Sequence, residues 1–202
     1  KLTSGQHTSQ AAVIHAHTLE VLESIGVSER LVAEGLKLTQ FSIRDRDRVL
    51  LRLRFDTLPT RYNFVLMLPQ DVTERILTEA LVEAGGAVRW GCTVESLTET
   101  AKGIHACLAT SEGKQIEPAR YVIGADGMNS LVRETAGIGF SGGSHKESFV
   151  LADVSMDWEH GGNEVMLFLS AAGLLVIAPL MAGKYRIVAT LENAPAQPVI
   201  TD

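Results

Sequence analysis

The sequence is poor in three features that would each indicate a class of protein. It has two cysteines in 202 residues, Cys92 and Cys107, without the C-x-x-C spacing of many metal and redox sites. Basic residues are a minority, 18 against 24 acidic ones, and the net charge of −6 argues against nucleic acid or an anionic membrane as the main partner. No apolar run reaches the roughly 18 residues that a membrane-spanning helix needs, and the residues after Lys1 form no signal-peptide core. We therefore expect a soluble protein of the cytoplasm with two free thiols, a disulfide between them being the alternative.

Familiar catalytic patterns are also missing. The sequence contains neither the G-x-S-x-G turn of the α/β-hydrolases nor the Walker A loop of P-loop nucleoside triphosphatases. His15 and His17 are two residues apart, so in a strand their side chains would share a face and could bind one metal ion. No third ligand lies near them in the sequence. We expect no metal site.

The periodicity of apolar residues predicts an α/β fold. Helical spacing and glycine stops predict helices over residues 18–25, 28–34 and 71–83, the last one capped by Asp71. Alternation predicts a hairpin over residues 38–55, in which Arg52 and Arg54 lie opposite the apolar face. Further strands are predicted at residues 64–68, 87–90, 94–98, 104–110, 121–123, 149–156, 164–169, 174–180 and 185–191. Helices and strands alternate early and strands alone follow late, which indicates an α/β layer plus a β-sheet layer.

One stretch, residues 121–143, holds two candidate ligand-binding motifs. Residues 137–142 satisfy G-x-G-x-x-G, but they follow a helical segment, whereas a dinucleotide fingerprint must leave a strand and enter a helix. We interpret Gly137 as the end of that helix. The turn at residues 124–127 has the required strand–turn–helix context and carries Asp126. The spacing leaves two roles open for Asp126, a ligand contact or an Asx turn.

The segment "GADGMNSLVRETAGIGFSG" resembles the internal Asp-Gly motif of the class A flavoprotein aromatic hydroxylases, the para-hydroxybenzoate-hydroxylase-like FAD monooxygenases. "AAVIHAHTLEVLESIGV", "MLPQDVTERILTEALVEAGGAVRWGCTVESL" and "SFVLADVSMDWEHGGNEVMLFLSAAGLLVIAPLMAGKYRIVATL" resemble other segments of that family, in the family's order. The resemblance implies part of a Rossmann-like FAD-binding layer plus a mostly antiparallel β-sheet layer that binds the substrate. Residues 1–37 and 69–140 would belong to the FAD-binding domain, and residues 38–68 and 141–202 to the substrate-binding domain. It also implies that this chain is the central portion of a longer enzyme, without the first βαβ unit and the later ribityl-binding segment.

The resemblance assigns cofactor contacts to four residues. Gln70 falls where the family binds the ribose or adenine end of FAD, and Val94 lies on the strand whose backbone meets adenine. Asp126 is the acid of the Asp-Gly motif, linked to flavin and nicotinamide binding, while Arg133 is its structural arginine. Gln10 replaces a frequent arginine at the flavin phosphates, and its neutral amide supplies no charge there.

The family's chemistry is the hydroxylation of an aromatic or polyketide-like substrate with NAD(P)H and O2, in which FAD performs the redox steps. No side chain is therefore predicted to be catalytic, and the 202-residue chain alone is expected to be inactive. Two alternatives stay open: a related flavoprotein with other chemistry, such as a halogenase or reductase, or a fragment that binds no flavin.

Overall fold

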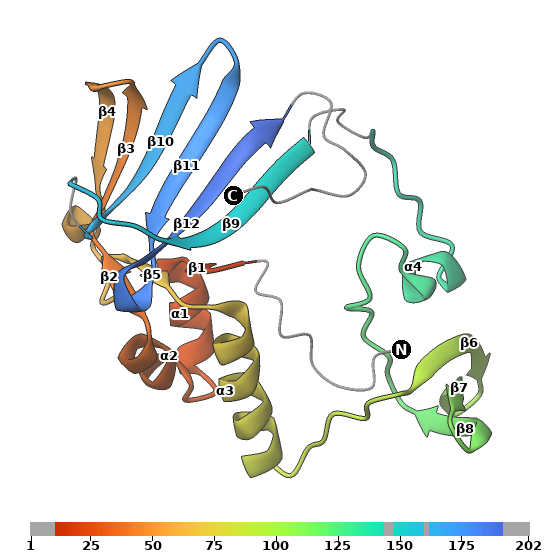
Figure 1. Cartoon of the computed structure of the whole chain (residues 1–202). Coiled ribbons are helices and arrows are strands. Elements are labelled where there is room, and N and C mark those ends of the chain that lie inside the picture. Colours follow the sequence, from red (N-terminus) through yellow and green to blue (C-terminus); the bar gives the residue numbers. More distant parts are fainter. Residues whose placement is uncertain (1–10, 144–147, 160–161, 192–202) are drawn as a thin grey trace. The chain divides into compact units, whose positions relative to one another are not determined.

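The computed structural model describes residues 11–143, 148–159 and 162–191. The described residues form two compact units, one of residues 87–143 and one of residues 11–86 together with 148–191 (Figure 1). This division follows contacts within the chain, and the expected assignment to a FAD-binding and a substrate-binding domain stays a prediction. The mixed α/β class predicted from the sequence is confirmed. Among the described residues, no helix has the length and apolar character needed to cross a membrane.

In the larger unit, a helical layer packs on a small sheet. The helices are α1 (Ala16–Glu23), α2 (Ser28–Glu34) and α3 (Gln70–Glu83). The sheet has the order β1 (Val13–Ile14), β5 (Val65–Met67) and β2 (Leu36–Leu38), with antiparallel pairing. Leu19, Leu31, Leu66 and Ile76 are fully buried at the interface between helices and sheet. Each such side chain contributes about 1.5–3 kcal/mol by leaving water, so this layer fixes the positions of the helices.

Helix α3 begins one residue earlier than the sequence predicts. Pro69 occupies the N-cap position and Asp71 lies in the first turn, so the prediction that Asp71 caps this helix is wrong. Proline fixes its own φ and carries no N–H, which suits it to this boundary. The Gln70 amide donates to Glu74 Oε1 at 2.8 Å, so the first turn is held by this side-chain contact.

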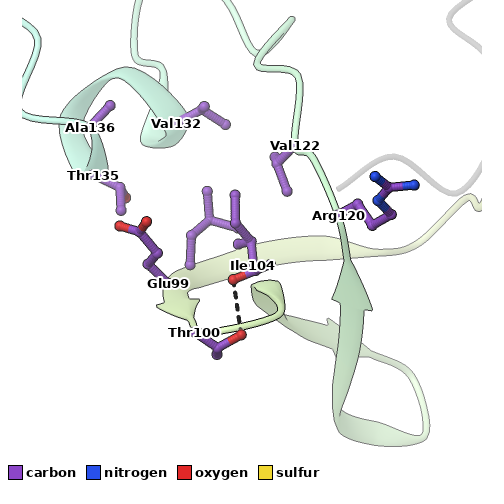
Figure 2. A pocket seen from close by; sticks show the side chains of 10 residues that line it. Glu99, Thr100, Ile104, Arg120, Val122, Val132, Thr135 and Ala136 are labelled. Carbon is purple, nitrogen blue, oxygen red and sulfur yellow. Dashed lines mark hydrogen bonds between the residues drawn. The ribbon is translucent and has the colours of Figure 1, made fainter.

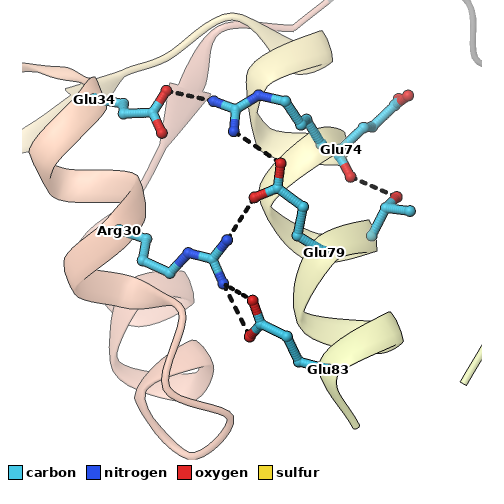
Figure 3. Close-up of polar contacts among 7 residues, drawn as sticks. Arg30, Glu34, Glu74, Glu79 and Glu83 are labelled. Carbon is cyan, nitrogen blue, oxygen red and sulfur yellow. Dashed lines mark hydrogen bonds and ion pairs between the residues drawn. The ribbon is translucent and has the colours of Figure 1, made fainter. Parts of the chain in front are cut away.

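Ion pairs join α2 to α3 on the solvent side. Arg30 contacts Glu79 at 2.5 Å and Glu83 at 3.3 Å, and Arg75 contacts Glu34 at 2.5 Å and Glu79 at 3.1 Å (Figure 3). These side chains are between one third and two thirds exposed. Exposed pairs of this kind contribute at most about 1 kcal/mol each, so the network adds orientation more than stability.

A six-stranded sheet forms the other layer of the larger unit. Its order is β4 (Arg48–Arg54), β3 (Gln40–Asp45), β10 (Glu164–Ser170), β11 (Gly173–Pro179), β12 (Lys184–Leu191) and β9 (Ser148–Ser155). Only the β3–β10 pair is parallel. Short 3₁₀ turns lie at η1 (Phe55–Thr57) and η2 (Met181–Gly183). One face of this sheet packs on β5, with Val165, Ala178 and Leu180 in one cluster with Val65 and Met67 of β5. Strand β5 is therefore buried on both faces. The strand bounds confirm the predicted hairpin and the predicted late strands.

The smaller unit is an antiparallel meander followed by a short helix. The meander has the order β6 (Thr93–Thr100), β7 (Gly103–Thr110) and β8 (Gly113–Ala119), and the helix is α4 (Leu131–Thr135). Strand β8 was not predicted because its sequence has no apolar alternation. The strands predicted at residues 87–90 and 121–123 are not present in the described structure. Tyr121 and Ile123 are 80% and 91% exposed, since no described strand pairs with them.

Candidate functional site

The turn at residues 124–127 is shaped by two glycines. Gly124 passes so close to α4 that a Cβ at this position would lie 2.6 Å from the Val132 Cβ. Gly127 has φ +78°, a left-handed conformation that side chains other than glycine rarely adopt. The backbone therefore turns sharply against α4 and places Asp126 beside the helix.

The Asp126 carboxylate is bound at three points. Its Oδ1 accepts from Ser130 Oγ at 2.5 Å, and its Oδ2 accepts from the backbone N–H groups of Leu131 at 2.7 Å and Val132 at 3.3 Å. Ser130 Oγ in turn accepts from the Arg133 N–H at 3.0 Å and forms the N-cap of α4. The turn-forming role of Asp126 is thus present. A carboxylate offers about four acceptor positions, so one position remains for a further donor.

These contacts keep Asp126 ionised. Its pKa lies below the ordinary value, chiefly because Ser130 donates to the carboxylate, while partial desolvation opposes this effect. The backbone N–H groups of Val132 and Leu131 lower the pKa further. A hydroxyl group of a ligand would therefore meet a charged acceptor, which forms stronger hydrogen bonds than a neutral one.

The helix ends as the sequence predicts. Gly137 follows α4 with φ +66°, and its N–H donates to the Glu134 carbonyl at 3.0 Å. The described residues after it are not helical, so the G-x-G-x-x-G pattern at 137–142 is not followed by a helix and its interpretation as a loop is confirmed. The Arg133 guanidinium lies 4.4 Å from the centroid of the Phe140 ring, a contact that ties this loop to α4.

A cavity of about 350 Å³ opens beside the turn. Val94 and Asp126, which the resemblance selects, line it together, although 32 positions separate them in the sequence. Cys92, Thr93 and Asn129 also line the cavity and were not predicted. Cys92 and Thr93 immediately precede Val94 in the sequence. Their position next to Val94 is the only feature of the sequence that could have predicted them as cavity residues.

A second cavity of about 440 Å³ lies between the meander and α4 (Figure 2). Leu97, Ile104 and Val122 give it an apolar lining, and Figure 2 shows Glu99 and Arg120 on opposite sides of Ile104. Val122 and Val132 line both cavities, so the contact between the turn segment and α4 forms the wall between them. Asp126 does not line this second cavity.

The other two predicted residues do not belong to the described part of this unit. Gln70 belongs to the larger unit, where its Oε1 accepts from the Ala11 N–H at 3.2 Å and so ties the segment before β1 to α3. Gln10 lies outside the described residues. Both cysteines are free thiols, and no cluster of metal-ligating side chains occurs within the described ranges.

Comparison with known proteins shows the family to which the chain belongs. Residues 1–191 match the family model described as FAD binding domain. The chain is 33% identical over 195 residues to pentachlorophenol 4-monooxygenase of Sphingobium chlorophenolicum, covering 93% of this chain and 36% of that protein. It is also 33% identical over 188 residues to 6-methylpretetramide 4-monooxygenase of Streptomyces rimosus, covering 91% of this chain and 33% of that protein.

The fold is shared with a solved structure of p-nitrophenol 4-monooxygenase from Pseudomonas putida DLL-E4. The TM-score is 0.88 at 19% sequence identity, and the match covers 97% of this chain and 51% of that one. The chain thus spans about a third to a half of the length of these proteins.

Proposed function

Because this chain belongs to the FAD binding domain family, we propose that it forms the central part of a flavin-dependent monooxygenase. The enzyme would hydroxylate an aromatic or polyketide-like substrate with NAD(P)H and O2. The names of the similar proteins support this class, since one is a pentachlorophenol monooxygenase and the other a 6-methylpretetramide monooxygenase. The observation that carries the proposal is the ionised Asp126 carboxylate in the lining of a cavity that also includes Val94.

We propose that this cavity holds a polar part of FAD. Two small residues, Gly124 and Ala125, lie in its lining beside a carboxylate that retains one acceptor position, and this supports the proposal. We propose that Asp126 accepts from a hydroxyl group of the cofactor and that the backbone at Val94 contacts its adenine. Gln70 and Gln10 would hold the ribose and phosphate ends. FAD, when bound, supplies the electron transfer from NAD(P)H to O2 and the transfer of oxygen to the substrate.

The protein's own part in this reaction would be to bind, orient and exclude water. The described side chains at the cavity include no arrangement of nucleophile and base, so no residue is assigned a catalytic role. We propose that residues 1–37 and 69–140 bind FAD and that residues 38–68 and 141–202 bind the substrate. The two free thiols and the acidic net charge suit a cytoplasmic enzyme whose partners are small molecules.

The full-length protein encoded by the gene provides the test. It would be incubated with NADPH or NADH, ¹⁸O2 and a panel of phenols and polycyclic phenols, and the products analysed by mass spectrometry. We expect one ¹⁸O atom in the product ring and one nicotinamide oxidised per product. Flavin-bound protein that incorporates halide, or that reduces an isoprenoid chain without incorporating oxygen, would instead assign it to a different flavoprotein chemistry.

A further inference from the structure

Strand β4 forms one edge of the six-stranded sheet, and within the described residues it pairs with β3 alone (Figure 1). Every residue of this strand is exposed. Four of its side chains are aliphatic and between 38% and 49% exposed, namely Val49, Leu50, Leu51 and Leu53. An open edge strand of this kind is the surface to which a further strand can be added.

The free edge of β4 offers main-chain hydrogen-bonding groups at two arginines. The N–H of Phe55 donates to the Thr39 carbonyl at 2.8 Å, so Phe55 directs its main-chain groups towards β3. In an antiparallel pair this direction alternates from one residue to the next. Leu53 therefore also directs its N–H and C=O groups towards β3, while Arg52 and Arg54 direct theirs away from the sheet.

The side chains along this edge differ between the two faces of the sheet. Residues two positions apart in a strand share a face, so Arg52 and Arg54 lie on one face and Leu51 and Leu53 on the other. A strand added to this edge would place its own side chains opposite these, face by face. Acidic side chains suit the arginine face, and aliphatic side chains suit the leucine face.

The positive charge on the arginine face is not fully matched within the sheet. The Nε of Arg52 lies 4.0 Å from Glu164 Oε1, but Glu164 also contacts Arg44 at 3.4 Å. Two arginines thus share one carboxylate, and the Arg52 side chain is 51% exposed. Arg54, in contrast, is matched by Asp56 at 2.7 Å. A carboxylate opposite Arg52 would therefore meet a charge that lacks a full partner.

A second copy of this strand suits the edge less well than an acidic strand does. It would bring its own arginines against Arg52 and Arg54, and like charges placed opposite each other destabilise a sheet. The extra residue Leu50, between the paired residues Leu51 and Val49, also bends the strand and ends its regular edge. The arginines thus hinder self-association and leave an oppositely charged strand as the favoured partner.

We propose that β4 binds an extended segment of a partner protein, in which acidic and aliphatic residues alternate, as an additional strand of the sheet. The main chain of that segment pairs with Arg52 and Arg54. Its carboxylates lie on the arginine face, and its aliphatic side chains cover Leu51 and Leu53. This interaction goes beyond the proposed flavin chemistry and does not require it.

Binding of synthetic peptides to the full-length protein tests the proposal. One short peptide alternates glutamate and valine, and a second has lysine in place of each glutamate. A third keeps the glutamates but is N-methylated on alternate main-chain nitrogens, which removes the donors that face β4. The variant is Arg52→Gln. Its matched control is Arg48→Gln, which loses the same charge on the same strand but lies beyond the bulge. Thermal unfolding shows whether each variant is folded.

We expect the glutamate peptide to bind the wild-type protein at least about tenfold more tightly than the lysine peptide or the N-methylated one. Arg52→Gln should weaken this binding at least about threefold, and Arg48→Gln should weaken it less. Amide hydrogen exchange of residues 48–54 in the wild-type protein, followed by mass spectrometry, should slow when the glutamate peptide binds. This measurement decides the question even if a variant does not fold.

Four results would overturn the proposal. They are equal binding of the glutamate and lysine peptides, equal effects of the two variants, unchanged hydrogen exchange over residues 48–54, and no binding of any peptide up to about 1 mM. Self-association of the wild-type protein that the glutamate peptide reverses would instead assign the edge to a second copy of the chain, and would also overturn it.

Discussion

Arg186 and Asp153 face each other across β12 and β9 and share two hydrogen bonds, from Nε to Oδ1 at 2.8 Å and from Nη2 to Oδ2 at 2.9 Å. The Arg186 side chain is 6% exposed and the Asp153 side chain 35% exposed. This pair joins the edge strand β9 to β12 and so to the rest of the sheet.

The pair makes stability depend on pH in a definite direction. The Arg186 guanidinium holds the pKa of Asp153 below its usual value of 3.8, so folding favours the ionised carboxylate. This contribution is fully present above the unfolded-state pKa and is lost as the pH falls through the lowered pKa of the folded protein. Asp153→Asn should therefore lose less stability than the wild type between about pH 5 and about pH 2, measured by thermal unfolding.

At neutral pH the same variant, Asp153→Asn, should lower the free energy of unfolding by about 1–2 kcal/mol. The value is below that for a fully buried pair because solvent screens Asp153. Arg186→Met combined with Asp153→Leu should be closer to the wild type, since no charge is left buried. A double variant less stable than Asp153→Asn would contradict this explanation.

Asp126 has a structural and a proposed cofactor role, and two substitutions separate them. Asp126→Ala in the full-length protein should weaken FAD binding by about tenfold, because it removes a charged hydrogen-bond acceptor. Ser130→Ala also removes a contact of the α4 N-terminus but leaves the carboxylate in place. FAD affinities from fluorescence titration that fall equally in both variants would leave Asp126 with its structural role alone.

The close approach at Gly124 predicts a compensating pair of substitutions. Gly124→Ala would place a methyl group 2.6 Å from the Val132 Cβ and should destabilise the protein by about 1–3 kcal/mol. Val132→Ala removes the two Cγ methyl groups that would lie 3.0 Å away but keeps the Cβ, so the double variant should recover only part of this loss. Denaturant unfolding of the four proteins measures the coupling, and strictly additive effects would show that the contact is not formed.

Much of this fold could be predicted because its signals are local. The late strands β10, β11 and β12 and the hairpin of β3 and β4 follow from alternation and turn residues, and the end of α4 follows from Gly137. The strand predicted at residues 121–123 failed because pairing is not a local property. Its apolar residues, Tyr121 and Ile123, are exposed where no described strand lies beside them.

The site was harder to predict than the fold. The spacing around Asp126 left its role open, and only the family resemblance selected Val94, 32 positions away, which the structure places at the same cavity. The order of the six-stranded sheet depends on the parallel pairing of β3 with β10, two strands whose paired residues Ile43 and Leu167 are 124 positions apart. Periodicity within one strand does not reveal such a register.

The isolated residues 1–202 should purify without flavin colour and should not oxidise NADPH. The single G-x-G-x-x-G pattern lies in a loop after α4, so the described residues offer no helix N-terminus after a glycine fingerprint for the diphosphate. The remaining neutral contacts contribute about 1 kcal/mol each, which is small against association costs of several kcal/mol. An absorbance band of bound flavin at near-equal stoichiometry in this fragment would contradict the prediction.

The flavin content of the full-length protein tests the central claim most directly. The protein would be purified, its absorbance spectrum recorded, and any released cofactor identified by chromatography against FAD and FMN. We predict close to one FAD per chain, bleached by NADPH or NADH without oxygen and restored to the oxidised spectrum when air is admitted. A folded, colourless protein that binds no added FAD would contradict the account.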